Sequence, residues 1–339
     1  MSFLILHVLN ISFCVLLLLN QGEAINYLYG GDYNATQVSS SIGINIQEEE
    51  LKSSGYRAIK RYNDGFVAAG SEGRIDWISA SGKIVKAKRI AGENFNCLLS
   101  DIKETIVAGD NGTILISSDE ETFRKINSGS DKNISSLALF KGNIIAGTKD
   151  KGIILCEGMD SFRHIYLAVK GDIVSLSSRT SDCFGVTDQG EIIHTTDGVN
   201  WSIFDFNQVY KGFYKSCYFT KILVTEKNIV ITGKRDDDLP VIMISTLGNV
   251  WTERDLIYTD ENGMQGFLTD LPKDIFYDDL RDELYLICNK GKLMKLPSCS
   301  HCNKLRLLPA ENLAGISGNS ETLMIVGDNF YIETINPEW

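Results

Sequence analysis

The chain has 339 residues, of which 43% are hydrophobic and 23% are charged. This balance is ample for a buried core and excludes wholesale disorder. The formal net charge of −11 argues against nucleic acid as the main partner, because binding phosphates needs a concentrated excess of Lys and Arg.

Residues 3–19 form an apolar run that is followed by Asn20-Gln21-Gly22-Glu23-Ala24. An apolar stretch that ends in small residues is typical of a secretory signal, and it predicts cleavage after Ala24. An uncleaved anchor is the alternative, since no Lys or Arg precedes the run. However, seventeen residues with polar interruptions are short for about 30 Å of hydrocarbon. We expect residues 1–24 to be removed, leaving an exported or secreted protein without stable membrane insertion.

Short strand-turn-strand units recur through the rest of the chain. Their second glycines, Gly73, Gly112, Gly152 and Gly190, step by 39, 40 and 38 residues. In the second unit, four short segments have strand patterns, at residues 96–99, 105–108, 112–116 and 123–126. Units of four strands bury one another when they pack radially around an axis. The period therefore predicts one all-β domain, a β-propeller, over residues 25–339.

The number of units predicts seven four-stranded antiparallel blades. The stretch from Gly190 to Gly291 holds two longer units, whose insertions we assign to residues 235–240 and 256–271. The last unit, 313–335, has about three strands, so we expect a strand at residues 25–32 to complete it and close the ring. An eight-bladed ring is the alternative, because Gly30 lies one period before Gly70.

The stretch Thr195–Trp201 is a polar turn with an Asp and a Gly, closed by a Trp, and weaker copies lie at 117–123 and 245–251. It resembles the Asp-box of sialidase-type (BNR) propellers and of the photosystem II assembly factor group. In those families the box is a structural hairpin at the rim, where the Asp caps backbone amides and the aromatic residue packs between strands. The resemblance therefore implies a folding role for Asp197, Gly198 and Trp201, and no catalytic role.

The residues that sialidases use for catalysis have no clear counterpart here. Sialidases have an arginine cluster, a Tyr paired with a carboxylate and an Arg-Ile-Pro motif, whereas Arg89-Ile90-Ala91 lacks the proline. The paired acids at 278–279 and 282–283 fit an exposed turn, and Asp236–Asp238 lacks the spacing of a calcium loop. We predict no catalytic residue, no metal site and no cofactor.

Export affects how the cysteines and asparagines are interpreted. Cysteines at 97, 156, 183, 217 and 288 lie in apolar strand-like runs and fit small buried hydrophobes. Cys299 and Cys302 lie in a loop, where a local disulfide, half a zinc site and a redox pair are all open. We favour the disulfide, because no second Cys/His pair at zinc-finger spacing follows. In a eukaryotic source, the sequons predict N-glycosylation at Asn34, Asn111, Asn133 and Asn200.

Loops on a rigid scaffold are the usual binding surfaces of propellers. The insertion at 256–271 carries Tyr258, Met264 and Phe267, which we predict to contact a partner; packing on its own scaffold is the alternative. We expect a secreted, monomeric, non-enzymatic binding or scaffold module for a protein or glycan ligand. A glycan hydrolase of sialidase-like architecture and an assembly factor for a membrane complex are the alternative functions.

Overall fold

The repeats fold into sheets of antiparallel strands, and in all but the sixth sheet the strand order follows the chain. The computed structural model describes residues 54–339 apart from 91, 101–103, 159–160 and 298–301. The first sheet is formed by β1 (Tyr56–Tyr62), β2 (Gly65–Gly70), β3 (Arg74–Ile78) and β4 (Ile84–Arg89). The next sheets are formed by β5 (Phe95–Ser100), β6 (Thr105–Gly109), β7 (Ile114–Ser117) and β8 (Arg124–Ile126); β9 (Ile134–Phe140), β10 (Asn143–Thr148), β11 (Gly152–Cys156) and β12 (Phe162–Tyr166); and β13 (Ile173–Ser178), β14 (Cys183–Thr187), β15 (Glu191–Thr195) and β16 (Ser202–Asp205).

The second half of the chain continues the pattern, with a hairpin added to the sixth sheet. The fifth sheet is formed by β17 (Cys217–Val224), β18 (Ile229–Arg235), β19 (Pro240–Ser245) and β20 (Thr252–Glu253). The sixth is formed by β21 (Ile257–Asp260), β22 (Gln265–Phe267), β23 (Pro272–Asp278), β24 (Glu283–Cys288), β25 (Lys292–Pro297) and β26 (Lys304–Leu307). The seventh is formed by β27 (Leu313–Gly318), β28 (Leu323–Gly327) and β29 (Ile332–Ile335). Short helical turns lie between strands at η1 (Ser71–Gly73), η2 (Asp110–Gly112) and α4 (Phe206–Val209).

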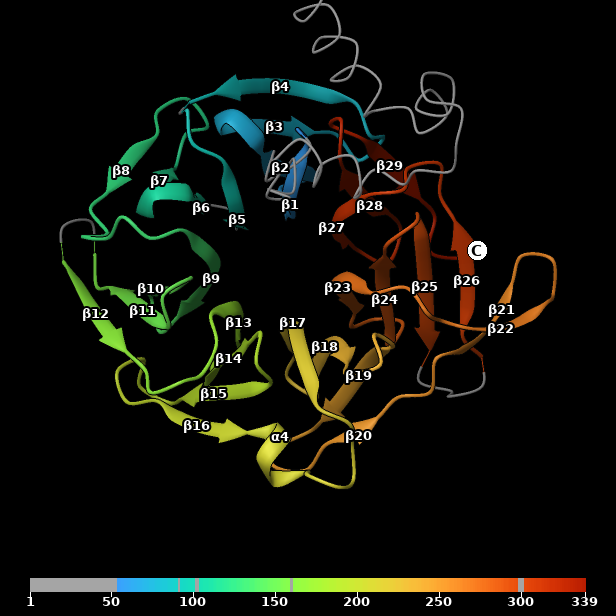
Figure 1. Cartoon of the computed structure of the whole chain (residues 1–339). Coiled ribbons are helices and arrows are strands. Elements are labelled where there is room, and N and C mark those ends of the chain that lie inside the picture. Colours follow the sequence, from blue (N-terminus) through green and yellow to red (C-terminus); the bar gives the residue numbers. More distant parts are fainter. Residues whose placement is uncertain (1–53, 91, 101–103, 159–160, 298–301) are drawn as a thin grey trace, which may run out of the picture. The chain divides into compact units, whose positions relative to one another are not determined.

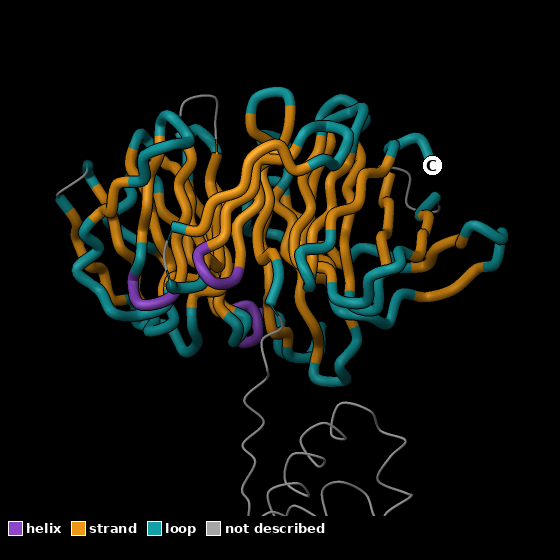
Figure 2. The backbone as a smooth tube through the Cα atoms, turned by 90° about the horizontal axis from the view of Figure 1, so that it is seen from above, coloured by secondary structure: helices purple, strands orange, loops and turns teal. Residues whose placement is uncertain are grey.

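The sheets stand around a common axis as the seven blades of a propeller (Figure 1). The innermost strands are β1, β5, β9, β13, β17, β23 and β27, and each of them contacts the next around the full circle, with β27 packing against β1. Seen from the side, the strands cross the thickness of the disc and the turns cover its two faces (Figure 2). The prediction of seven four-stranded blades is confirmed, and the eight-bladed alternative is wrong.

The middle strands are buried on both faces because each blade is covered by its two neighbours. All residues of β6 and of β14 are buried, so these strands appear in the sequence as continuous apolar runs. The core therefore lies between blades. Between the second and third blades, for example, Ile106 and Ile114 pack with Ile134 and Leu137.

Turn chemistry fixes where the strands of each blade end. The predicted segments of the second repeat correspond to β5, β6, β7 and β8, with ends that differ by a few residues. The turn between β6 and β7 has Asn111 and Gly112 at φ of 55° and 64°. Only residues that tolerate positive φ fit such a turn, which is why Asn and Gly mark it in the sequence.

The predicted insertion at 235–240 accounts for part of the additional length of the fifth blade. Gly233 pairs with Val241, whereas the equivalent Gly109 of the second blade bonds to Thr113, so the β18–β19 hairpin has four more residues than its counterpart. Further additional residues lie at 206–216, in the connection that contains α4. This connection was not recognised because its aromatic residues resemble a buried strand. The ring of Phe206 lies 4.7 Å from that of Tyr210 and 5.9 Å from that of Tyr214.

A buried polar cluster joins the first blade to the last. Asp76 is fully buried, accepts a hydrogen bond from the Tyr56 hydroxyl and pairs with Arg74 at 2.8 Å. The Arg74 guanidinium also lies 4.1 Å from the ring centre of Phe330, which belongs to the turn between β28 and β29. The predicted closing strand at 25–32, the signal at 1–24 and Asn34 all lie outside the described residues. None of the described helices has the length and apolar character that a membrane span requires.

Candidate functional site

The turn at Thr195–Trp201 connects β15 to β16 and is held by side-chain hydrogen bonds. Asp197 Oδ1 accepts hydrogen bonds from the backbone N–H groups of Val199 and Asn200, at 2.8 and 2.7 Å. Thr195 Oγ1 accepts one from the N–H of Gly198, at 2.9 Å. The bonds from Asn200 are the main reason that the pKa of Asp197 lies well below its usual range. The carboxylate is therefore committed to its own turn.

Trp201 completes the same turn. Its side chain packs, half-buried, against the core between the third and fourth blades, and its Nε1 donates a hydrogen bond to the carbonyl of Gly198 at 3.3 Å. Gly198 has a φ of 83°, which a residue with a side chain rarely adopts. This geometry is consistent with the folding role that the resemblance implies. Membership of the Asp-box families remains a hypothesis.

Two other blades carry the turn in altered form. In the second blade, Asp119 Oδ1 accepts hydrogen bonds from the N–H groups of Glu121 and Thr122 at 2.9 and 2.7 Å, and these bonds lower the pKa of Asp119 to about 2. In the fifth blade, an exposed Leu247 replaces the Asp, while Ser245 Oγ still accepts from the N–H of Gly248 at 2.9 Å.

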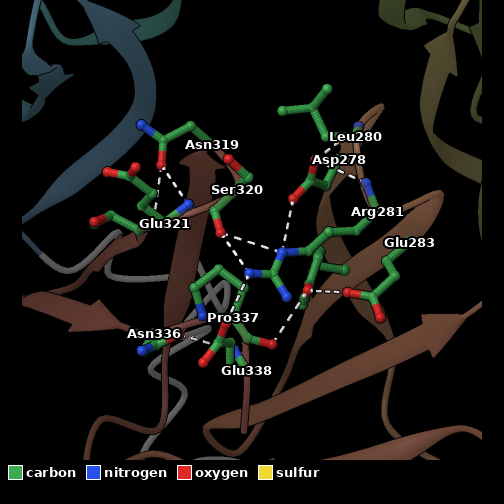
Figure 3. Close-up of polar contacts among 12 residues, drawn as sticks. Asp278, Leu280, Arg281, Glu283, Asn319, Ser320, Glu321, Asn336, Pro337 and Glu338 are labelled. Atoms are coloured by element: carbon green, nitrogen blue, oxygen red, sulfur yellow. Dashed lines mark hydrogen bonds and ion pairs between the residues drawn. The ribbon is translucent and has the colours of Figure 1, made fainter.

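The acids of the turn between β23 and β24 make contacts within the fold (Figure 3). Asp278 Oδ1 accepts a hydrogen bond from the N–H of Leu280 at 3.0 Å, and Asp278 Oδ2 lies 3.6 Å from Arg281 Nε. Arg281 also donates to the carbonyl of Ser320 in the seventh blade at 2.8 Å and lies 3.4 Å from Glu338 (Figure 3). This cluster connects the sixth blade to the seventh.

The second pair of acids is engaged in the same way. Glu283 accepts a hydrogen bond from the Tyr285 hydroxyl at 2.5 Å and pairs with Lys295 at 3.0 Å. Asp282 accepts one from the Tyr277 hydroxyl. A Tyr beside a carboxylate is a sialidase feature; here Tyr285 is fully buried and Tyr277 is half-buried.

Two acids of the run Asp236–Asp238 pair with neighbouring lysines. Asp237 pairs with Lys215 and Asp238 with Lys234, each at 2.7 Å. Across the described part of the chain, no three His, Cys, Asp or Glu side chains converge as metal ligands would.

The predicted glycosylation sites differ in exposure. Asn111 and Asn200 are exposed, whereas Asn133 is half-buried and its Oδ1 accepts a hydrogen bond from the N–H of Asn111 at 3.1 Å. Asn200 Nδ2 donates to Asp197 Oδ2 at 2.7 Å. A glycan on that nitrogen would compete with this bond. Glycosylation stays a prediction at each site.

The strand cysteines are small buried side chains, as expected. Among the described residues they form no disulfide, and Cys97 alone of the five is only half-buried. Burial raises the pKa of Cys97 to about 12, so its thiol stays protonated at neutral pH. Cys299 lies outside the described residues, and its disulfide with Cys302 stays a prediction.

The insertion at 256–271 forms a hairpin on the outer edge of the sixth blade. β21 pairs in parallel with β26, and β22 is the outermost of the described strands in the six-stranded sheet (Figure 1). The hairpin projects from the ring in both views (Figures 1 and 2). Met264 is 68% exposed and Phe267 is 44% exposed, while Tyr258 is half-buried against the core between the fifth and sixth blades. Of the three predicted contacts, two lie on the surface and one faces inward.

The base of this hairpin is anchored firmly. Leu256 and Leu268 are 2% and 0% exposed, within the core between the fifth and sixth blades. The buried Asn303 donates hydrogen bonds to the carbonyls of Asp255 and Ile257, at 3.1 and 2.8 Å. The hairpin therefore presents its exposed side chains on a rigid support.

The innermost strands share a feature that the sequence analysis missed. Each has one β-bulge, where its pairing with the second strand skips a residue. The bulged residues are Arg57, Asn96, Ser135, Val174, Thr220, Lys273 and Ala314. The first four recur every 39 residues, but their residue types share no pattern that marks them in the sequence.

The bulges redirect side chains toward the neighbouring blade. Arg57 Nη1 donates a hydrogen bond to Asn96 Oδ1 at 2.5 Å, and Asn96 Nδ2 donates to the carbonyl of Ile134 at 3.2 Å. Ser135 Oγ continues the series by donating to the carbonyl of Ile173. These residues line a central cavity of about 270 Å³.

Solved structures place this fold among known propellers. The chain is similar to YCF48 from Cyanidioschyzon merolae, with a TM-score of 0.61 and 14% identity over 85% of this chain and 97% of that one. The WD40 propeller domain of Doa1 has a TM-score of 0.64 and 12% identity, covering 85% and 95% of the two chains. The Neurospora crassa Pan2 WD40 domain has a TM-score of 0.63 and 8% identity, covering 83% and 88%. No family model and no curated protein sequence matches the chain. Identities this low establish the fold alone.

Proposed function

We propose that the chain is a non-enzymatic binding module, exported after removal of residues 1–24, that recognises a protein partner through the β21–β22 hairpin. The observation that carries this proposal is the pair of exposed apolar side chains, Met264 and Phe267, on a hairpin whose base is buried. Rigid support matters because less conformational freedom is lost when a partner binds.

The chemistry of the hairpin favours a protein over a glycan. Burying an exposed Met or Phe side chain contributes about 1.5–3 kcal/mol, and a thioether adapts to partner surfaces of different shape. The outer edge of β22 also offers backbone N–H and C=O groups to an extended segment of a partner. A glycan would instead need several converging polar groups at the tip.

Affinity capture with matched variants tests this proposal. Deleting residues 256–271 would remove Leu256 and Leu268 from the core, so point substitutions are preferable. We expect a Met264→Asp, Phe267→Asp double variant to lose at least ten-fold in partner recovery. A Phe213→Asp, Leu280→Asp variant removes two side chains that are each 84% exposed elsewhere on the ring, and should retain the partner.

Three results would contradict the proposal. Equal recovery by the hairpin variant would exclude the hairpin as the contact surface. Retention on a glycan array, unchanged in the hairpin variant, would favour a glycan site elsewhere. Turnover of a fluorogenic glycoside would show an enzyme. In the assembly-factor alternative the partner is a membrane complex. Affinity capture of that partner from detergent-solubilised membranes tests this alternative directly.

A further inference from the structure

The central cavity has a charge opposite to that of the whole protein. The chain has a net charge of −11, yet the charged residues that line this cavity are three cations, Arg57, Lys60 and Lys221, and one carboxylate, Asp274. All four come from the inner strands β1, β17 and β23. Positive charge is thus concentrated where the surrounding strands reduce contact with bulk water.

Lys221 occupies a position that has a different role in other blades. The residue after the bulge is Ser136 in the third blade and Ser175 in the fourth, and each hydroxyl accepts a hydrogen bond from the backbone N–H of the next inner strand, at 2.6 and 3.2 Å. Asp274 does the same in the sixth blade, at 3.1 Å. A lysine cannot accept such a bond. Lys221 instead pairs with Asp274 at 2.9 Å, so this carboxylate already has two partners.

Lys60 lies at the junction of two cavities. It lines the cavity described above and also a second one, of about 330 Å³, that continues toward the turns between β17 and β18 and between β23 and β24. The charged residues that line the second cavity besides Lys60 are of both signs, Arg179, Glu226 and Asp279. The excess of cations is therefore confined to the first cavity.

The ammonium group of Lys60 has no carboxylate within ion-pair distance among the described residues. It is accessible to water in the channel, but the surrounding protein displaces bulk water and lowers the pKa of Lys60; the more distant Asp274 acts in the opposite direction. Burial also lowers the pKa of Arg57, despite the charges of Asp110 and Asp328. Its guanidinium donates to the neutral Asn96.

Hydroxyl groups in the same cavity have hydrogens available. Ser136, Ser175 and Ser177 each accept a backbone N–H through Oγ, and none of them donates to another described residue. A hydroxyl that accepts in this way still has one hydrogen to donate. Cations together with hydroxyl donors are the groups that bind phosphate and carboxylate oxygens.

We propose that this cavity is a binding site for a small dianion, a phosphate or a short dicarboxylate, held by Lys60, Arg57 and Lys221. A water molecule occupies about 30 Å³ in the liquid, so the cavity accommodates a compact anion with some solvent. Attraction between opposite charges is stronger there than at an exposed surface, because the effective dielectric constant is lower. This site is separate from the hairpin of the sixth blade.

Titration with inorganic phosphate and with malonate, against sodium chloride at matched ionic strength, tests the proposal. We expect saturable binding of at least one of the two dianions by calorimetry, and comparison of the two distinguishes a phosphate ligand from a dicarboxylate. Lys60→Gln should weaken that binding at least ten-fold. Lys60→Arg retains the charge and should bind within about three-fold of wild type. Lys83→Gln removes an exposed lysine from the turn between β3 and β4 and should bind as wild type does.

Absence of saturable binding for both anions would overturn the proposal, as would unchanged binding by Lys60→Gln. A circular dichroism spectrum and a melting curve establish that this variant is folded. A second measurement needs no variant, because selenate soaked into crystals of the wild-type protein is located by its anomalous scattering. Selenate beside Lys60 would support the site, and selenate bound only elsewhere would exclude it.

Discussion

At the scale of single residues, Asp197 shows how a carboxylate can be essential to a turn and unavailable for chemistry. Its oxygens accept two backbone N–H groups and the side-chain amide of Asn200. All of these bonds favour the charged form, which is why the pKa of Asp197 is lowered. The same bonds occupy the lone pairs that a catalytic base would use.

We expect Asp197→Asn to lower the free energy of unfolding at neutral pH, because an amide oxygen accepts weaker hydrogen bonds than a carboxylate. The pKa of Asp197 is lower in the folded protein than in the unfolded chain, where it is about 3.9. The stabilisation from the carboxylate is therefore fully present above that value and is lost as the pH falls through the folded pKa.

Urea unfolding of wild type and Asp197→Asn across a pH series measures this difference. The gap in unfolding free energy should be constant above about pH 5 and should shrink below about pH 4. Asp64→Asn changes an exposed acid in the turn between β1 and β2 and serves as the control. A gap that widens on acidification would contradict the assignment.

At the scale of elements, the β21–β22 hairpin has apolar residues of two kinds, some buried in the core and some exposed to solvent. Leu268 is fully buried in the core between the fifth and sixth blades, whereas Met264 lies exposed at the tip. The pattern of the insertion in the sequence does not separate them, because both are apolar residues within a few positions of each other. They differ in their place on the hairpin, because Leu268 follows β22 at the base, where its N–H bonds to the carbonyl of Leu256, and Met264 precedes β22.

We expect Leu268→Ala to lower the free energy of unfolding by about 2–5 kcal/mol, through lost burial and the cavity left behind. Met264→Ala should change it by no more than about 0.5 kcal/mol, because the side chain makes few contacts within the fold. Chemical denaturation of the two variants measures both effects. Similar losses in the two variants would mean that the hairpin tip also packs on the scaffold.

The sequence predicted the elements that depend on local chemistry. The φ-positive turn at Asn111 and Gly112 and the buried runs of β6 and β14 could be predicted, because glycine positions and apolar patterns are read directly. The bulges could not, since a skipped residue such as Ser135 leaves the apolar pattern of its strand nearly intact. The cavity could not be predicted for a different reason. Lys60 and Lys221 are far apart in the sequence and meet only when the ring closes.

At the scale of the whole molecule, closure of the ring depends on the first and last blades. In the described residues, these blades meet through β1 and β27, through a bridge between Gly55 and Asp328 and through the cluster around Asp76. Among the described residues the seventh sheet contains three strands, and none of them pairs with the outer edge of β29. The strand predicted at 25–32 has the position in the chain that would suit that edge.

We expect a protein of residues 33–339 to melt at a lower temperature than one of residues 25–339, because removing the predicted strand would leave β29 unpaired at its outer edge. Differential scanning calorimetry measures the two melting temperatures. Residues 33–52 are present in both proteins, so a general effect of a long N-terminal segment is controlled. Identical melting temperatures would mean that 25–32 does not close the ring.

Each of the seven blades has one bulged residue at the equivalent position of its inner strand. Strand pairing skips this residue, so its side chain is under little constraint from the ladder, and Arg, Asn, Ser, Val, Thr, Lys and Ala all occupy it. Three of these residues, Arg57, Asn96 and Ser135, line the central cavity. A substitution at one of them changes the lining and leaves the strand pairing of the blade in place, so a homologue with the same ring can select a different ligand.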